Sequence, residues 1–432
     1  MKNSTVKLLI TALMLFVIFP KTFAQSNLEP FLVGDALPDA PELAKRGEYK
    51  IGVRTLDLIN KSQVDVLKSK GAVEAMYDRP LKVEIWYPAD VANDVKEMVT
   101  YDHVLGMLND PKRPLTPFKF NGRAIRDAKP KNANGAFPLI IVSHGYLGSR
   151  YLMTYLTENL ASKGYVVVTI DHFESTYADA APFPSTLLNR AKDILFILNQ
   201  MAELSKPNGN SFLAGLADAN NTGLIGYSMG GYGALNAAGA GYSPQAAMLF
   251  GTMTGGNKSI EVRTTNNPAF VASQDARIKA VVAFAPWGMQ SGVWDAEGLK
   301  GLKIPTFFVA GSQDDVSGYE DGIKAIYKGA VNTERYLLTY MNARHNVAPN
   351  PPPVESYKNQ KNYEHFSEPA WNEKRINNIN QHFVTAFMGI QLKHQDLGKF
   401  LSVQPNSNEK LWTGFVPRSS VGLELLHDMP VK

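Results

Sequence analysis

Leu224-Ile225-Gly226-Tyr227-Ser228-Met229-Gly230-Gly231 is the stretch of this sequence that decides the fold. Two apolar residues lead into a Gly-x-Ser-x-Gly motif, and a segment rich in alanine and glycine follows up to residue 240. A strand, a tight turn and a helix in this order form a nucleophile elbow, in which small residues permit a strained turn and close packing. Open α/β sheets bind ligands at the carboxyl ends of their strands. The motif therefore predicts that Ser228 lies at that edge as a nucleophile.

Apolar runs and helical patterns alternate on both sides of this motif. Short continuous apolar runs are typical of strands that are buried on both faces, and they occur at 138–143, 165–170, 278–284, 304–310 and 336–340. Helical spacing predicts helices over 152–162 and 186–204 and a closing helix near 376–390, with Gly164 as the C-cap of the first. This alternation predicts an α/β fold with a mainly parallel sheet and helices on both of its faces.

The remaining segments are less regular. Alternating apolar and polar residues predict antiparallel strands over 49–58 and 81–87. We expect one domain over 49–395, with insertions near 103–137, 241–277 and 346–369 that are either lids or ordinary surface loops. Residues 25–48 read as an N-terminal arm, and residues 396–432 as a C-terminal tail.

The first 24 residues have the pattern of a secretory signal peptide. Lys2 and Lys7 precede an apolar run over 8–19, and cleavage is expected after Ala24. The alternative is a membrane anchor, but a span needs about 20 apolar residues. Removing this leader and its three lysines lowers the formal charge from +4 to +1, so the basic balance indicates neither a nucleic-acid partner nor stable membrane insertion. We expect a secreted or periplasmic bacterial protein.

The sequence contains no cysteine. A disulfide framework, a cysteine nucleophile and a zinc–thiolate site are therefore excluded. No pattern in the chain indicates a metal or an organic cofactor, so we expect neither.

A serine hydroxyl needs a base, and in this fold the order along the chain is serine, acid, histidine. His345 follows the last predicted buried strand, in a position from which its loop can return over the sheet edge. The other histidines downstream of Ser228 are more simply packing or solvated residues, and they are His365, His382, His394 and His427. His345 is therefore the predicted base.

The acid is expected just past the strand that precedes His345. Asp314 and Asp315 both follow the run over 304–310. We predict that Asp314 orients the imidazole and stabilises its charged form. Asp315 is the alternative, and a helix cap or a solvated charge is its simpler role.

An oxyanion hole needs two N–H donors aimed at one point. The residue after the nucleophile, Met229, supplies one of them in this fold. The loop after 138–143 reads Ser143-His144-Gly145-Tyr146, and Tyr146 is the better candidate for the second N–H. His144 precedes Ser228, so the order is wrong for a base and a structural, hydrogen-bonded role is expected.

Several blocks of the sequence resemble a group within the α/β-hydrolases. The blocks are LKVEIWYPA, SHGYLGSR, GYSMGG, AFAPWG, VAGSQDD and the closing helix, and together they cover roughly residues 49–395. The group includes platelet-activating factor acetylhydrolases, dienelactone-hydrolase-like bacterial proteins and cutinase-like polyester hydrolases. The chain departs from true dienelactone hydrolases, which have a cysteine in place of Ser228, and from the compact polyester hydrolases, which lack its long insertions.

This resemblance implies a triad of Ser228, Asp314 and His345, an oxyanion hole of Tyr146 and Met229, and a carboxylic ester hydrolase that works through an acyl-enzyme. It also implies that Tyr146 and Trp287 flank the substrate, although Trp287 could equally be a core residue. The expected substrate is a small-molecule, lipid or polymer ester. An amidase or peptidase with the same triad is an alternative. A non-catalytic binding protein is a further alternative, but such a protein should have lost one of the three residues.

Overall fold

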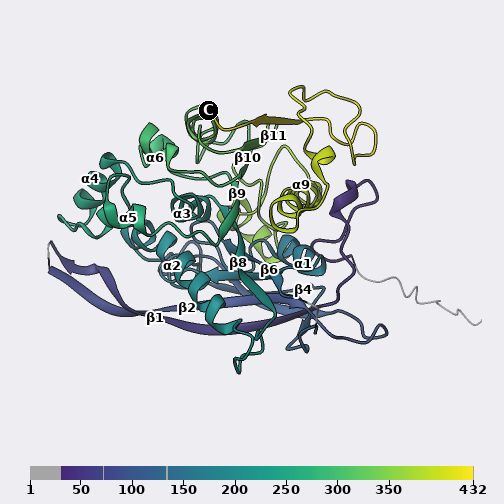
Figure 1. Cartoon of the computed structure of the whole chain (residues 1–432), viewed down its shortest axis with the longest axis horizontal. Helices are drawn as coiled ribbons and strands as arrows, with labels where there is room; N and C mark the ends of the chain where they lie inside the picture. Colours follow the sequence, from purple (N-terminus) through teal and green to yellow (C-terminus); the bar gives the residue numbers. More distant parts are fainter. Residues whose placement is uncertain (1–30, 72, 133–134, 432) are drawn as a thin grey trace, which may run out of the picture. The chain divides into compact units, whose positions relative to one another are not determined.

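The buried apolar runs of the chain lie side by side in one mixed sheet of ten strands (Figure 1). The computed structural model describes residues 31–71, 73–132 and 135–431. The sheet order is β12-β11-β10-β9-β8-β6-β7-β2-β1-β5. Its centre consists of six parallel strands, which are β6 (Phe137–Ser143), β7 (Val166–Asp171), β8 (Ala217–Tyr227), β9 (Ile278–Phe284), β10 (Thr306–Gly311) and β11 (Arg335–Tyr340).

Four helices cover the two faces of this sheet. α2 (Phe183–Leu204) and α3 (Met229–Ala237) pack against each other on one face, and α1 (Thr154–Ser162) and α9 (Glu373–Lys393) pack against each other on the opposite face (Figure 1). The expected α/β-hydrolase architecture, with a mainly parallel sheet and helices on both faces, is confirmed. Gly164 follows α1 with φ +82°, as a helix C-cap requires.

The N-terminal strands are much longer than the sequence predicts. β1 (Ile51–Lys70) and β2 (Val73–Pro88) form a hairpin that pairs from Ile51↔Pro88 to Lys70↔Val73. The apolar alternation is lost after residue 58, where a register shift occurs between Asn60 and Gln63. The far part of the hairpin lies beyond the sheet and is largely exposed, so it carries no burial pattern for the sequence to reveal.

The three predicted insertions contain regular structure of their own. The first holds most of a two-stranded sheet, β3 (Val99–Leu105) and β4 (Thr116–Gly122), and the short β5 (Ile125–Arg126). The second holds α4 (Pro244–Met253) and α5 (Pro268–Ala272), and the third holds α8 (Gln360–Glu364). Two further short helices, α6 (Ala296–Lys300) and α7 (Lys324–Gly329), lie between β9 and β11. These elements span few turns, so they lack the long periodicity on which the sequence-based prediction depends.

Segments near both ends of the described chain pack on the sheet domain. Residues 396–432, predicted as a tail, include β12 (Leu423–Asp428), which pairs antiparallel with β11 and buries Leu423 and Leu425 at the sheet edge. The described part of the predicted arm also packs on the domain, where Leu37 N–H donates to Asn378. Residues Leu32–Lys432 therefore form one unit. The expected signal peptide, residues 1–24, lies outside the described residues.

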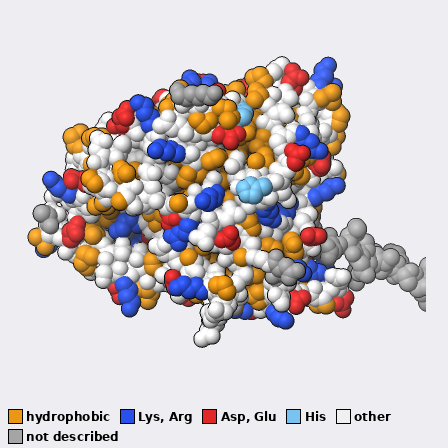
Figure 2. Space-filling model, in the orientation of Figure 1, with side chains coloured by type: hydrophobic (Ala, Val, Ile, Leu, Met, Phe, Trp, Pro, Cys, Tyr) orange, Lys and Arg blue, Asp and Glu red, His pale blue; other side chains and the backbone are white. Residues whose placement is uncertain are grey.

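Two properties of the described residues bear on what the protein contacts. None of the helices among them is both long and apolar enough to cross a bilayer. On the face shown in Figure 2, basic and acidic side chains are interspersed rather than gathered into a field of one sign.

Candidate active site

Ser228 lies on a strained turn between β8 and α3. Its backbone angles are φ 52° and ψ −114°, a conformation that costs a residue with a side chain about 1–3 kcal/mol. Neighbouring backbone groups hold it there. Ser228 N–H donates to Phe284 O at 2.9 Å, and Ser228 O accepts from Tyr232 N–H at 3.0 Å and from Trp287 N–H at 3.2 Å. The turn presents the hydroxyl at the carboxyl edge of the parallel strands.

The glycines of the elbow are required by close packing. A Cβ atom on Gly226 would lie 2.2 Å from Gly230 O, and a Cβ atom on Gly230 would lie 1.9 Å from Ser143 O. Both distances are well below van der Waals contact. The two glycines therefore let α3 begin directly against β6 and β8.

Ser228, His345 and Asp314 form a hydrogen-bonded row. Ser228 Oγ lies 3.0 Å from His345 Nε2, and His345 Nδ1 lies 2.8 Å and 3.0 Å from the two carboxylate oxygens of Asp314. The Asp314 side chain is fully buried, and its Oδ1 also accepts from Val316 N–H and Ser317 N–H. The carboxylate holds the imidazole with its unprotonated nitrogen toward the serine, which is the geometry of an activated nucleophile.

The rival acid has a different environment. Asp315 is exposed and forms an ion pair with Arg344, whose hydrogen bond lowers the pKa of the Asp315 carboxyl. In the described part of the chain Asp315 makes no hydrogen bond to His345, so of the two neighbours it is Asp314 that contacts the imidazole.

The other candidate histidines lie in other places. His382 is buried in α9 and His427 lies in β12, where it contacts Glu334. His394 ends α9, and the half-buried His365 packs against Tyr177. Of the histidines in the described part of the chain, His345 is the one that hydrogen bonds to Ser228.

The backbone N–H groups of Tyr146 and Met229 border Ser228. Met229 is the first residue of α3, where N–H groups have no partner within the helix. Gly145, directly before Tyr146, approaches so closely that an added Cβ atom would lie 3.5 Å from Ser228 Cβ. Neither N–H donates to another group among the described residues. Both N–H groups can therefore donate hydrogen bonds to the oxygen of a carbonyl group whose carbon is attacked by Ser228 Oγ.

Three aromatic side chains, two of them from loops whose backbone borders the elbow, contact one another in a row. The rings of Tyr146 and Phe183 are 5.4 Å apart, and those of Phe183 and Trp287 are 5.3 Å apart, both edge to face. All three side chains are half-buried. Tyr146 and Trp287 were expected here from the resemblance, whereas Phe183 was missed because it stands between Pro182 and Pro184, outside any helical pattern.

A cavity of about 510 Å³ opens beside His345. One wall comes from the loops after β10 and β11, with Asp315 and Arg344, and the other from the third insertion, with Gln360 and Glu364. Most of its side chains are charged or polar, in contrast to the aromatic row.

Comparisons with known proteins agree with this fold. A family model described as PETase, PET hydrolase-like, matches residues 120–264. Cutinase est1 of Thermobifida alba is 24% identical over 232 residues, which are 54% of this chain and 60% of that protein. Bis(hydroxyethyl) terephthalate hydrolase of Streptomyces coelicolor is 29% identical over 151 residues, which are 35% of this chain and 43% of that protein. The matches thus span less than two thirds of either relative.

A solved structure extends the likeness over most of the fold. The ferulic acid esterase from Streptomyces cinnamoneus superimposes with a TM-score of 0.53 at 19% identity, covering 82% of this chain and 94% of that one. Of the three groups that the sequence blocks resemble, these comparisons confirm the resemblance to the cutinase-like polyester hydrolases. The chain has an α/β-hydrolase fold and is related to the cutinase-like polyester hydrolases.

Proposed function

We propose that this protein is a serine hydrolase that cleaves carboxylic esters through an acyl-enzyme on Ser228. The observation that carries the proposal is the hydrogen-bonded row from Ser228 Oγ through His345 to the buried Asp314, located at a strained elbow. A nucleophile, a base and an orienting acid in this arrangement serve acyl transfer. The kinship with cutinases supports the ester as the bond that is cleaved.

The reaction follows from the positions of these groups. His345 Nε2 takes the proton of Ser228 as Oγ attacks the ester carbonyl carbon, and the carbonyl oxygen becomes an oxyanion that accepts from the N–H groups of Tyr146 and Met229. The intermediate collapses, the alcohol leaves with the proton from His345, and the acyl group stays on Oγ. Water then attacks with His345 again as base, which releases the carboxylic acid and restores the serine.

The aromatic row supports an aromatic acyl group. Tyr146, Phe183 and Trp287 offer ring edges and faces beside the oxyanion donors, where the acyl part of the ester must lie. Two similar proteins are named for esters of aromatic acids, terephthalic acid in one case and ferulic acid in the other. We therefore place the acyl part against this row.

The cavity beside His345 supports a polar alcohol part. The leaving oxygen takes its proton from His345, so the alcohol departs on the side of this ring. There the cavity presents Asp315, Arg344, Gln360 and Glu364, side chains that can hydrogen bond to hydroxyl or ether oxygens. Small esters and accessible polymer ends both satisfy these requirements.

The proposal also places the protein outside the cytoplasm. The pattern of residues 1–24 supports export and cleavage after Ala24. Sequencing the N-terminus of the mature protein from its bacterial host tests this directly, and a start at Gln25 is expected.

Ester and amide substrates with one shared acyl group test the activity. Purified enzyme should hydrolyse a p-nitrophenyl ester of an aromatic acid far faster than the matching p-nitroanilide, whereas comparable rates would favour the amidase alternative.

Ser228→Ala and His345→Ala should each lower kcat on the order of a millionfold, and the double variant should be little worse because the groups act as a unit. Wild-type-like hydrolysis by either folded variant would reject the triad. An inactive wild type that binds esters would favour a binding protein.

A further inference from the structure

The peptide between Gly145 and Tyr146 has its orientation fixed by a side chain. Gly145 O accepts from His144 Nδ1 at 2.5 Å and from Gly148 N–H at 3.2 Å. In a trans peptide the carbonyl and the N–H point in opposite directions. With the carbonyl held toward His144, the N–H of Tyr146 is directed away from that ring. A flipped peptide would present an oxygen instead of a donor and would destroy the oxyanion hole.

This arrangement needs one particular tautomer of His144. The backbone N–H of His172 donates to His144 Nε2 at 3.2 Å, so that nitrogen carries no proton. Burial lowers the pKa of His144 well below its ordinary value, which keeps the ring neutral with its single proton on Nδ1. That proton is the one donated to Gly145 O.

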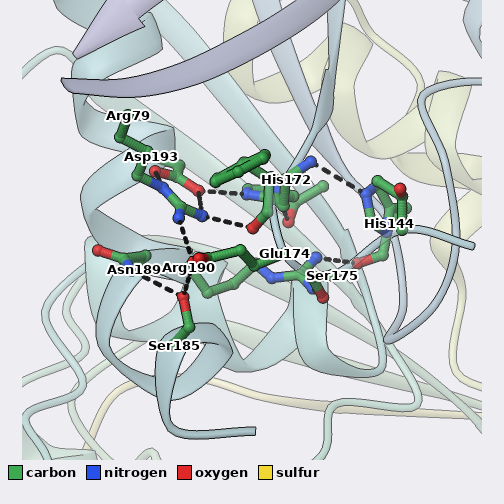
Figure 3. A network of polar contacts seen from close by, with 12 residues as sticks. Arg79, His144, His172, Glu174, Ser175, Ser185, Asn189, Arg190 and Asp193 are labelled. Atoms are coloured by element: carbon green, nitrogen blue, oxygen red, sulfur yellow. Dashed lines mark hydrogen bonds and ion pairs between the residues drawn. The ribbon is translucent and has the colours of Figure 1, made fainter. Parts of the chain in front are cut away.

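His172 is anchored by a buried ion pair (Figure 3). His172 Nδ1 donates to Asp193 Oδ2 at 2.9 Å. The Arg79 guanidinium donates to both carboxylate oxygens of Asp193, at 2.8 Å and 2.9 Å. Burial alone would raise the pKa of Asp193, but Arg79 and the hydrogen bond from His172 bring it down to about 2. The charges are therefore paired across the physiological range, and the His172 backbone cannot shift without breaking them.

The same ring reaches the strand before the loop. Ser143 Oγ lies 2.8 Å from His172 Nε2, so Ser143, His172 and Asp193 form a second row of serine, histidine and aspartate. Each of the three is 1% exposed or less, so no substrate can reach the hydroxyl and the row is structural. It fixes the end of β6, where the loop begins. Arg190 holds the loop as well, by donating to His144 O at 2.5 Å.

We propose that His144 is a positioning residue that aims the N–H of Tyr146 into the oxyanion hole, and that the buried row Arg79–Asp193–His172 sets the His144 tautomer that this requires. The inference rests on the proposed function, because it assigns a role in stabilising the oxyanion of ester cleavage.

Two substitutions at position 144 distinguish a role in orienting the Tyr146 N–H from a role in packing alone. Asn at position 144 carries an amide nitrogen where Nδ1 stands and can still donate to Gly145 O, whereas Leu fills similar space without a donor. His144→Leu should lower kcat on the order of 10²- to 10³-fold with KM within about threefold, since a lost oxyanion donor acts on the transition state. His144→Asn should recover most of that loss. His103→Leu, which removes a half-buried imidazole, is the control and should stay within about threefold of wild type in kcat.

A second readout distinguishes this role from damage to the fold. The affinity for a boronic acid inhibitor, which forms a tetrahedral adduct on Ser228, should fall in His144→Leu in parallel with kcat/KM, while the affinity for the product acid stays unchanged. Equal loss in the Leu and Asn variants, or a Leu variant as active as wild type, would overturn the proposal. An inactive wild type would instead reject the proposed function.

The tautomer can also be measured in the unaltered protein. NMR of isotope-labelled imidazole nitrogens should show His144 neutral and protonated at Nδ1, with the signal assigned by its loss in His144→Asn. A charged ring, or a proton on Nε2, contradicts the inference even if the Leu variant fails to fold.

Discussion

Asp314 and Asp315 are neighbours in the chain, but only the first contacts His345. Asp314→Asn should leave the fold intact and lower kcat by about 10⁴-fold, because the amide favours the wrong imidazole tautomer. Asp315→Asn is the matched control, since it removes an exposed partner of Arg344 and should change kcat by less than about threefold. Steady-state kinetics on one ester decides the assignment, and reversed results would make Asp315 the acid.

Phe183 joins the two aromatic residues that the sequence blocks indicated. Phe183→Ala should raise KM for an aromatic acyl ester by roughly tenfold, since one edge-to-face aromatic contact is worth about 0.5–1.5 kcal/mol and some apolar contact is lost with it. An acetyl ester does not reach the row, so its KM should be nearly unchanged. Equal effects on both esters would show that Phe183 shapes the site rather than contacting the acyl group.

The extent to which the site could be predicted differs from residue to residue. Ser228, Asp314 and His345 follow strand ends, and the order of strands in this fold indicates where such residues meet. The buried partners of His144 could not be found in this way. Arg79 and Asp193 lie 114 positions apart, on β2 and α2, and nothing in either local pattern reveals that they pair.

At the scale of elements, the start of α3 depends on contact between backbones. Gly230→Ala would press a methyl group against Ser143 O, so we expect the free energy of unfolding to fall by about 1–3 kcal/mol. Because α3 also carries Met229 N–H, kcat should fall as well. Gly398→Ala is the control, since no atom lies within 4 Å of the added Cβ atom. Denaturant unfolding measures the stability of both variants. A Gly230→Ala protein as stable as wild type would show that α3 can shift.

Elements with a buried face were predictable and those without one were not. The five apolar runs lie where continuous apolar sequence places them, because a strand in the middle of a covered sheet is buried on both faces. α1, α2 and α9 lie where helical periodicity places them, and α3 lies where the elbow motif places it. β12 and the outer half of the β1–β2 hairpin escaped prediction for one reason. An edge strand and a strand that leaves the core bury few side chains, so their pairing is decided by backbone hydrogen bonds that leave no trace in the sequence.

At the scale of the whole molecule, buried histidines predict how stability depends on pH. Burial lowers the pKa of His103, His172 and His382 to about 3 and that of His365 to about 4. In the unfolded chain these rings titrate near 6.5. Unfolding therefore takes up protons below pH 6.5, so the stability that the neutral rings allow is present above that pH and is lost as the pH falls toward 4.

Each such ring contributes about 1.4 kcal/mol per pH unit to this loss. Glu158 opposes it, because burial raises its pKa to about 7 and its contribution is lost as the pH rises from about 4.5 to 7. Burial also raises the pKa of Asp171 and Glu368, but the four imidazoles outnumber these three carboxyls, so the free energy of unfolding should fall on acidification from pH 6.5 to 4.5. His382→Asn keeps an acceptor for Leu43 N–H and should reduce the slope. Denaturant titrations at several pH values give these slopes, and a flat profile would contradict the prediction.

The most direct test of the account is to identify the acylated residue. The enzyme is mixed with a p-nitrophenyl ester, quenched within the first turnover and digested for mass spectrometry. We predict a burst of p-nitrophenol close to one equivalent of enzyme and an acyl group on the peptide that contains Ser228, with neither observed in Ser228→Ala. An acyl group on another residue, or ester hydrolysis that persists in folded Ser228→Ala, would contradict the central claim.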